Sequence, residues 1–447
     1  MTATESFRIC APPSVCSIAA RLEQAGYQAW AVGGAVRNAA LGIPAGDWDL
    51  ATSARPPQVQ RLFRRTVPLG LEHGTVGVLD HHGTLYEVTT FRRDVETFGR
   101  HAVVEYADTV DEDLARRDFT LNAMAWRPAT GELRDPFGGL ADLRARRLAT
   151  VGVPEDRFAE DYLRVLRALR FSGHFQLSIE PATWRALTGA VAYLDRLSAE
   201  RVREELWKIF KQTCRASAAL SLFGASGAVA ALFPELERTI GIFRERCRHD
   251  AWSTSLLAVD AISRQRPLLR MAALLHAVDL AGDPASDPET LPERVRPDHT
   301  GAGRIMRRLR ASNAETEWIA RLVTARNRWP QVQFSSAACI RQWLHGVGSD
   351  LVPDLFRLHF ALLRAGASPC PPDALADSAR QVRQVLRQRP PLRLADLAIG
   401  GNELGQLGLQ PGPGYGQILQ YLLSRVIHDP TLNSRDRLLE IVREELL

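Results

Sequence analysis

The spacing of apolar and polar residues divides the chain into an N-terminal part of mixed α/β character and a longer helical part. Residues 14–25 have the apolar spacing of a helix, and the stretch YQAWAV (27–32) predicts a strand. The glycine pair after this strand predicts a turn into a short helix that ends near Leu41. The stretch DWDLA (47–51) predicts a second strand.

A hairpin follows, and beyond it the period of the pattern changes. The segments TVGVLD (75–80) and LYEVTTF (85–91) are rich in β-branched residues and flank the turn HHGT, so they predict two paired strands. From about residue 158 the spacing becomes helical. One apolar stripe is expected to contain Phe158, Tyr162, Leu166 and Leu169. The fold class predicted from these patterns is α+β.

Breaks in the helical pattern divide the rest of the chain. They fall near Phe233-Pro234, from Gly282 to Pro297, around Trp329-Pro330 and from Ala367 to Pro372. The break from Gly282 to Pro297 is rich in Asp, Pro and Glu, so we expect a mobile loop there. We predict four parts, which are residues 1–137, 138–235, 236–330 and 331–447.

Composition adds a basic character to this picture. The chain of 447 residues has a formal net charge of +5, and 54 of its 56 basic residues are arginine. Arginine suits phosphate and base edges because it donates two parallel hydrogen bonds, although a GC-rich genome would give the same bias. No run of about 20 apolar residues is present, which predicts a soluble, cytoplasmic protein without a membrane partner.

Three acidic residues are candidates for a metal site. Asp47 and Asp49 are two positions apart, so on a strand they face the same side and can share divalent cations. Glu87, in the middle of the second hairpin strand, is a candidate third carboxylate. Hard carboxylate ligands of this kind suit Mg²⁺, which also binds substrate phosphates.

An anion site is expected directly upstream of these carboxylates. Gly33 and Gly34 permit a close approach of the backbone to a ligand, and the helix that starts behind them directs amide groups toward an anion. Arg37 lies one turn into that helix. A Mg²⁺ cofactor at the carboxylates and an anion site beside it together favour chemistry on a nucleotide.

Six motifs in a fixed order then identify a family resemblance. GGAVR and DWD with Thr52 are followed by EHGTVGVL, YEVTTFRRD, RRDFTLNAMAW (116–126), DPFGGLADL and AEDYLRVLRALRF (159–171). This series resembles the class II tRNA nucleotidyltransferase/poly(A) polymerase family. The resemblance implies a polymerase beta-like nucleotidyltransferase head with a small mixed sheet (1–137), then an all-α neck (138–235), body (236–330) and tail (331–447).

The resemblance also implies roles for residues of the head. Asp47 and Asp49 would hold two metal ions with Glu87 beside them, and Gly33, Gly34 and Arg37 would bind the triphosphate. In the RRDFT block, Arg116 and Arg117 would approach phosphate, while Asp118 and Asn122 would reach the sugar or order the site. An ordinary surface salt-bridge cluster is the alternative for this block.

The neck is expected to select the nucleotide. Asp161 and Arg164 are three residues apart and are expected on one helical face, where a carboxylate acceptor beside a guanidinium donor matches the Watson–Crick edge of cytosine. Rotated slightly, the pair also fits adenine. Arg167 and Arg170 would continue toward ribose and phosphates. The alternative is a set of Glu–Arg pairs on a solvated helix.

Three features depart from the family pattern. Asn38 stands where most members have aspartate, and Phe98 stands in a segment that resembles the family's flexible loop, where an acidic residue is common. The third departure is a degenerate HD-type segment, which has His276-Ala277 at the dyad position and Thr254 in place of a histidine. We therefore expect a structural helical body there, with packing or surface roles for His249, Asp250, His276 and His299.

The resemblance implies addition or repair of the tRNA 3′-terminal CCA from CTP and ATP, with release of pyrophosphate. The tail segment 392–423 would contact tRNA. Alternatives within the class are an enzyme that adds only CC or only A, and a poly(A) polymerase. An inactive RNA-binding protein of the same fold, or a nucleotidyltransferase for a small molecule, are the alternatives from outside it. The sequence leaves the oligomeric state open.

Overall fold

The computed structural model describes residues 9–44, 46–71, 74–98, 101–243, 248–280, 297–329, 334–367, 371–410 and 412–446. The backbone separates into two compact units: unit 1 is Met1–Ile209 with Ala218–Leu232, and unit 2 is Phe210–Ser217 with Phe233–Leu447. Most of the expected loop from Gly282 to Pro297 lies outside the described residues, as does the side chain of Phe98. No helix of the described ranges is both long and apolar enough to span a membrane.

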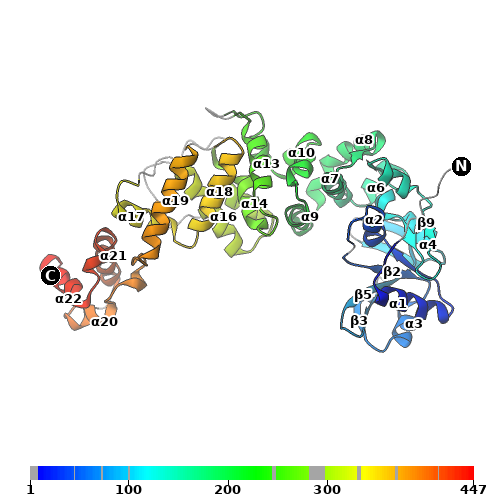
Figure 1. The fold of residues 1–447 in the computed structure, drawn as a ribbon, viewed down its shortest axis with the longest axis horizontal. Helices are drawn as coiled ribbons and strands as arrows, with labels where there is room; N and C mark the ends of the chain where they lie inside the picture. The colour runs from blue at the N-terminus through cyan, green and yellow to red at the C-terminus, as the bar shows by residue number, and fades with distance from the viewer. Residues whose placement is uncertain are drawn as a thin grey trace. The chain divides into compact units, whose positions relative to one another are not determined.

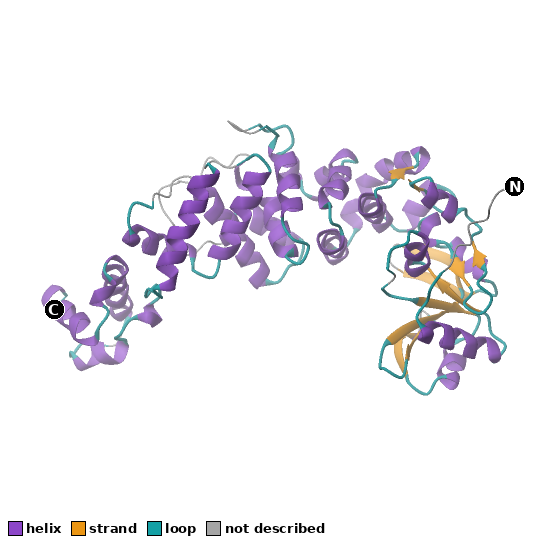
Figure 2. Ribbon diagram, in the orientation of Figure 1, coloured by secondary structure: helices purple, strands orange, loops and turns teal. Residues whose placement is uncertain are grey.

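All the named strands of the described chain lie in unit 1 (Figure 2). They are β1 (Ala29–Val32), β2 (Asp49–Thr52), β3 (Thr66–Gly70), β4 (Thr75–Leu79), β5 (Leu85–Thr90), β6 (Arg92–Phe98), β7 (His101–Tyr106), β8 (Ala125–Trp126), β9 (Leu133–Arg134), β10 (Arg147–Leu148) and β11 (Ser178–Ile179). Seven of them form one mixed sheet in the order β3-β4-β5-β2-β1-β8-β9. The predicted hairpin is present as antiparallel β4 and β5.

Unit 1 also contains the first set of helices. They are α1 (Pro13–Gln24), α2 (Gly34–Ala40), α3 (Pro56–Leu62), α4 (Val110–Ala115), α5 (Gly139–Arg144), α6 (Pro154–Glu160), α7 (Leu163–Phe175), α8 (Pro181–Ala190), α9 (Ala199–Gln212), α10 (Ala216–Ala225) and α11 (Ala228–Leu232). The end of α9 (210–212) and the start of α10 (216–217) belong to unit 2. The predicted all-α neck thus includes the short parallel strand pair β10–β11.

The two faces of the sheet differ in their cover. Helices α1 and α3 pack against the strands (Figure 1), and the strand residues Leu50 and Val88 are fully buried. The register places Leu50 opposite Val88 in parallel strands, so Asp49 and Glu87, one residue earlier on each strand, lie on the other face. Val110 and Leu114 of α4 share a buried apolar cluster with strand residues such as Trp30. Asp49 and Glu87 themselves are exposed.

The helical stripe predicted from residue 158 is interrupted. Phe158, Leu166 and Leu169 are buried as expected, but α6 ends at Glu160 and α7 begins at Leu163. Tyr162 lies at this break and is half-buried. The single helix predicted here is therefore wrong, and two helices meet at Asp161.

Unit 2 is helical throughout its described part. Its helices are α12 (Pro234–Glu237), α13 (Ala251–Ala261), α14 (Pro267–Leu275), α15 (Gly301–Arg308), α16 (Asn313–Arg328), α17 (Ala337–Val347), α18 (Val352–Arg364), α19 (Pro372–Arg387), α20 (Gly401–Gln406), α21 (Pro413–His428) and α22 (Arg435–Glu445). Helices α13, α14, α16 and α18 pack together, and α20–α22 share a separate apolar cluster around Leu404, Leu422 and Leu438. The observed fold confirms the predicted class, a mixed sheet followed by helices.

Candidate active site

The two aspartates of the DWD stretch lie where β1 and β2 leave the sheet. The strands are antiparallel, with Val32 opposite Asp49, so the turn at Gly33 and the segment before Asp49 lie at the same edge. β2 begins at Asp49, so Asp47 precedes the strand rather than belonging to it. The alternation still holds, because buried Trp48 separates exposed Asp47 from exposed Asp49. The two carboxylates are therefore both on the open side of the turn, and their predicted role as metal ligands stays a prediction.

The surroundings of Asp49 are acidic enough to perturb its titration. Its side chain is exposed, but neighbouring protein removes part of its hydration and, with the charge of Glu87 and then of Asp47, raises the pKa of Asp49 to about 6. The positive charge of Arg117 opposes this shift. Such like-charge crowding is relieved by a bound cation.

The donor set suits a hard cation that is only partly held by protein. In the described ranges, no three His, Cys, Asp or Glu side chains stand close enough together to enclose a metal ion, and this includes Asp47, Asp49 and Glu87. Mg²⁺ is commonly held by one or two carboxylates, with water and substrate phosphate oxygens as its other ligands. The exposed pair Asp47 and Asp49 fits that pattern.

The glycine turn is closely covered by an arginine. Gly33 has φ of +70°, and a Cβ there would lie 2.7 Å from Nη1 of Arg117. That guanidinium also donates to the carbonyl of Asn122 at 3.2 Å and to Asp113 at 3.1 Å. Only glycine accommodates both the backbone conformation and the arginine. Gly34 is the first residue of α2, so the amides of this helix begin at the turn.

Asp113 holds both arginines of the RRDFT block. This carboxylate is buried at the end of α4 and accepts from Arg116 and Arg117, each at 3.1 Å. Burial alone would raise the pKa of Asp113, but the two arginines lower it. Sequence reasoning missed Asp113, although its spacing of three and four residues before the arginines is the signal of a helical ion pair.

Arg37 is buried and held by amide oxygens. Its Nε and Nη2 donate to Oδ1 of Asn38 at 3.1 and 2.9 Å, and its Nη1 donates to Oδ1 of Asn122 at 2.6 Å. The rings of Phe171 and Phe175 lie 5.1 and 4.5 Å from its guanidinium carbon. Burial lowers the pKa of Arg37 to about 10. The predicted contact of Arg37 with a triphosphate stays a prediction.

Asp118 joins the head to α7. Its Oδ1 accepts from Nδ2 of Asn122 at 2.9 Å, and its Oδ2 accepts from Nη2 of Arg167 at 2.6 Å. Burial alone would raise the pKa of Asp118, but the charge of Arg167 and the bond from Asn122 lower it. Asn122 bonds to both Arg37 and Asp118, and Asp118 pairs with Arg167, so the three contacts connect the Arg37 and Arg167 side chains. The predicted roles of Asp118 and Asn122 stay predictions.

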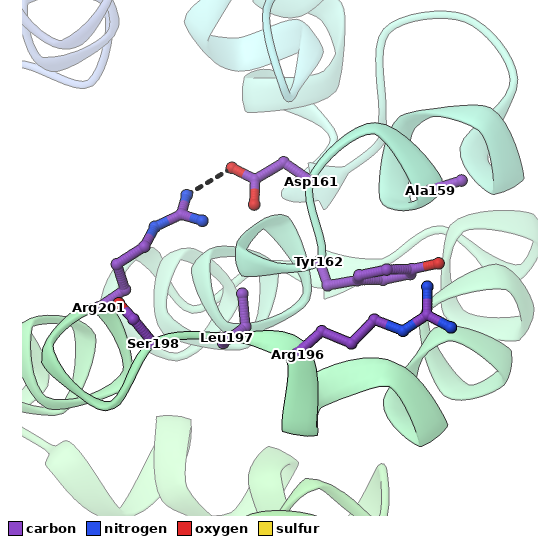
Figure 3. A pocket seen from close by; sticks show the side chains of 7 residues that line it. All are labelled: Ala159, Asp161, Tyr162, Arg196, Leu197, Ser198 and Arg201. Carbon is purple, nitrogen blue, oxygen red and sulfur yellow. Dashed lines mark hydrogen bonds and ion pairs between the residues drawn. The ribbon is translucent and has the colours of Figure 1, made fainter. Parts of the chain in front are cut away.

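The position of Asp161 differs from its prediction. It lies between α6 and α7 with extended backbone angles, so it does not share a helical face with Arg164. Its Oδ1 accepts from the amide of Leu163 at 3.0 Å, and its Oδ2 accepts from Arg201 of α9 at 2.6 Å (Figure 3). Asp161 and Arg164, the two residues predicted to select the base, are near neighbours in the chain, but their side chains bond to different partners.

Arg164 is held from the other side of the break. It forms an ion pair with Glu160 and donates to the carbonyl of Arg157 at 3.0 Å and that of Arg116 at 3.3 Å. The last of these bonds ties α7 to the RRDFT block. The Glu160–Arg164 pair corresponds to the alternative given for this helix, and its four-residue spacing is the sequence signal for such a pair.

Arg170 points into the interior of the neck. It forms an ion pair of 2.6 Å with Glu205, and both side chains are buried. Lys208 also pairs with Glu205, at 2.8 Å. Glu205 and Arg201 belong to α9, some 30 to 40 residues from their partners, so short-range spacing gave no signal for either.

The degenerate HD-type segment lies in unit 2. His276 is buried, and its Nδ1 is 3.2 Å from Oγ of Ser255. Asp250 caps α13 by accepting from the amide of Ser253 at 2.8 Å, and Thr254 is buried in the same helix. His249 and His299 are exposed. These positions are those of packing, capping and surface residues.

The sheet, the open pair of carboxylates and the glycine turn define a nucleotidyltransferase head. Comparison with family models agrees, since residues 29–149 match the poly A polymerase head domain and residues 176–240 match the probable RNA and SrmB-binding site of polymerase A.

Whole-length relatives name the family more closely. A CCA-adding enzyme of Latilactobacillus sakei is 33% identical over 95% of this chain and 96% of its own length. One from Limosilactobacillus reuteri is 32% identical over 95% and 94%. The Bacillus stearothermophilus CCA-adding enzyme in complex with CTP has a TM-score of 0.73 and 28% identity, covering 97% of this chain and 98% of that one. The chain belongs to the CCA-adding enzyme family.

Proposed function

We propose that this chain completes or repairs the 3′-terminal CCA of tRNA from CTP and ATP, acting in the cytoplasm. The observation that carries the proposal is the pair of exposed carboxylates, Asp47 and Asp49, at the sheet edge beside the Gly33 turn in a member of this family. Triphosphate chemistry requires the glycine turn and the carboxylates together, since the turn would bind the anionic phosphates and the carboxylates would bind a cation.

Asp47 and Asp49 would hold Mg²⁺, with Glu87 beside them. Held by these residues, a divalent ion would supply Lewis-acid chemistry, by which the pKa of the RNA 3′-hydroxyl would fall and the charge of the departing pyrophosphate would be neutralised. Arg117, whose charge already acts on Asp49, would bind phosphate oxygens next to the α2 amides. Arg116 would assist from the same block, and Asp118 with Asn122 would keep Arg37 and Arg167 in place.

Base selection would fall to Asp161 and Arg164. A carboxylate accepts from the exocyclic amine of cytosine or adenine, and a guanidinium donates to ring acceptors. Uracil and guanine lack this order of donor and acceptor. Because Asp161 is held by Arg201 and Arg164 by Glu160, each group would be oriented before the nucleotide arrives.

The reaction is tested with three tRNA transcripts that lack CCA, end in CC, or are mature, with CTP and ATP supplied singly and together. We expect addition of CCA to the first, of A to the second, and nothing on the third. Addition of A alone to the CC-ended transcript, without C addition to the shorter one, would identify an A-adding enzyme. A long adenylate ladder on unrelated RNA would identify a poly(A) polymerase.

A double variant tests the metal ligands. Asp47→Ala with Asp49→Ala should abolish incorporation and leave tRNA binding largely intact. The matched control, Asp108→Ala with Glu132→Ala, removes two other exposed acidic side chains of the head and should keep full activity. Unchanged turnover in the first double variant would refute the assignment.

A further inference from the structure

A pocket of about 320 Å³ lies in unit 1 on the side of Asp161 that faces α9. Its lining includes Tyr162, Arg196 and Arg201, and the Arg201 side chain reaches Asp161 across it (Figure 3). Arg164 does not line the pocket. A space of this size holds about one nucleotide, at the lower end of the range for small-ligand sites.

The pocket is lined by one aromatic ring, that of Tyr162, and Tyr193 lies next to this ring outside the lining. Tyr162 and Tyr193 stack with ring centroids 5.0 Å apart and planes 25° apart. Tyr193 is 42% exposed, so this pair is a surface feature rather than part of a core. The guanidinium carbon of Arg196 lies 4.7 Å from the Tyr193 ring centroid and 5.8 Å from that of Tyr162. We call these three residues the tyrosine platform.

The charge of the pocket is positive. Asp161 and Arg201 neutralise each other in their 2.6 Å ion pair. Arg196 is exposed, and its recorded contacts within the described chain are with the two rings. A guanidinium without an ion pair in the described structure, beside a half-buried ring stacked on an exposed one, is an arrangement that suits unpaired nucleotides, because every base has a face to stack and a phosphate follows it.

We propose that the tyrosine platform binds one unpaired nucleotide at the 3′ end of the RNA substrate, with its base stacked on the tyrosines and its phosphate beside Arg196. The proposal rests on the proposed function and extends it to the RNA strand. It also agrees with the match of residues 176–240 to the RNA-binding family model, a range that contains Tyr193 and Arg196.

A free triphosphate is a poorer occupant of the same pocket. The groups assigned above to phosphates, Gly33, Arg116 and Arg117, do not line it, and within the described ranges it offers one guanidinium without an ion pair rather than several. A nucleotide within an RNA chain carries one phosphate, with a single negative charge. The charge of Arg196 matches that requirement.

Binding is measured first, without nucleotide, on CC-ended transcripts with 2-aminopurine at each of the three unpaired 3′ positions in turn. Stacking quenches the fluorescence of this base. We expect quenching at one position with the wild-type chain and with Tyr193→Phe, and its loss with Tyr193→Ala. Equal quenching by wild type and Tyr193→Ala at every position would overturn the proposal. Absence of any transcript binding by the wild type would overturn the proposed function as well.

Kinetics then separate the strand from the free nucleotide. Tyr193→Ala and Arg196→Ala should each raise the KM for the RNA by about five- to thirty-fold, the range for loss of one stacked base. The KM for CTP and kcat at saturating RNA should change less than two-fold. The control Arg185→Ala removes an exposed arginine of α8 and should change neither. An increase in the KM for CTP with an unchanged KM for RNA would assign the pocket to the incoming nucleotide instead.

Discussion

At the scale of single residues, Arg37 shows how a buried cation is held beside the proposed reaction site. None of its recorded hydrogen bonds goes to a carboxylate, since its partners are the side-chain oxygens of Asn38 and Asn122. The carboxylate of Asp118, which bonds to Asn122, favours the charged form of Arg37. The positive charges of Arg170 and Arg167 disfavour it. Asn38 therefore supplies two bonds that orient the guanidinium, at a position where the family resemblance implies aspartate.

The first prediction concerns Asn38. Asn38→Ala removes the acceptor for Nε and Nη2 of Arg37, so kcat/KM for CTP should fall about tenfold, the effect of losing a hydrogen bond to a charged group. Asn38→Asp keeps the acceptor and adds charge, so it should stay within about threefold of wild type. Steady-state kinetics with varied CTP measure both. Equal losses in the two variants would contradict an orienting role.

The second prediction concerns Arg201 as a positioning residue for Asp161. Arg201→Gln removes the charge that holds Oδ2 of Asp161, so the preference for CTP over UTP, as a ratio of kcat/KM, should fall about tenfold. Arg201→Lys should restore part of it. Asp161→Ala should loosen discrimination against UTP and GTP further. Unaltered selectivity in Asp161→Ala would refute the assignment of base selection to Asp161.

Residue types could be predicted at this site, but their partners could not. The carboxylates, the glycine pair and the arginines are local patterns, and local chemistry indicates what they bind. Glu205 and Arg201 come from a helix distant in sequence, and a single sequence contains no pattern that joins them to Arg170 and Asp161.

At the scale of elements, the break between α6 and α7 was the main error in the predicted neck. The residues from Glu160 to Leu163 include neither proline nor glycine. The sequence therefore contains no signal for a break, and the apolar spacing predicts one continuous helix. Tertiary bonds decide the outcome, because Asp161 accepts from the amide of Leu163 and from Arg201. The hairpin was predicted correctly because turn chemistry and strand pattern are both local.

The third prediction concerns the contact of α7 with α10. Gly173 lies in α7, and a Cβ there would lie 2.3 Å from the Cα of Ala219 in α10. Gly173→Ala should therefore lower the free energy of unfolding by about 1–3 kcal/mol, because the two backbones must separate. Urea unfolding followed by circular dichroism measures this.

Gly189 supplies the matched control. It lies in α8, and no atom comes within 4 Å of a Cβ built on it. Gly189→Ala should leave stability unchanged or raise it by up to about 1 kcal/mol, through higher helix propensity. A loss in Gly189→Ala as large as that in Gly173→Ala would show that the effect does not come from the α7–α10 contact.

At the scale of the whole molecule, similarity to the family covers nearly the full chain, yet the two units carry different information. In unit 1, the ordered motifs of the sequence are sufficient to identify the head. In unit 2 the sequence predicts helices and breaks, but not the aromatic cluster around Trp329, which contacts Phe334, Trp343, Phe356 and His359. These residues lie between positions 329 and 359, from the end of α16 to α18, and the way these elements pack brings their rings together.

The last prediction follows from His359 in that cluster. Its ring lies 4.7 Å from the Trp329 ring, and Nε2 is buried without a hydrogen-bond partner in the described structure. Burial, and then the charge of Arg326, lower the pKa of His359 to about 3. The folded chain therefore keeps this imidazole neutral at pH values where the unfolded chain protonates it. Stability from this group is complete above the unfolded pKa of about 6.5 and is lost as the pH falls toward 3.

Between pH 7 and pH 5 that loss should be about 2 kcal/mol, because each pH unit below 6.5 costs about 1.4 kcal/mol. Urea unfolding of wild type and His359→Leu at both pH values isolates it, since all other titrating groups are common to the two proteins. We expect the free energy of unfolding to fall less for His359→Leu, by about that amount. Parallel pH curves would mean that His359 is solvated and titrates normally, and that the cluster is open to water.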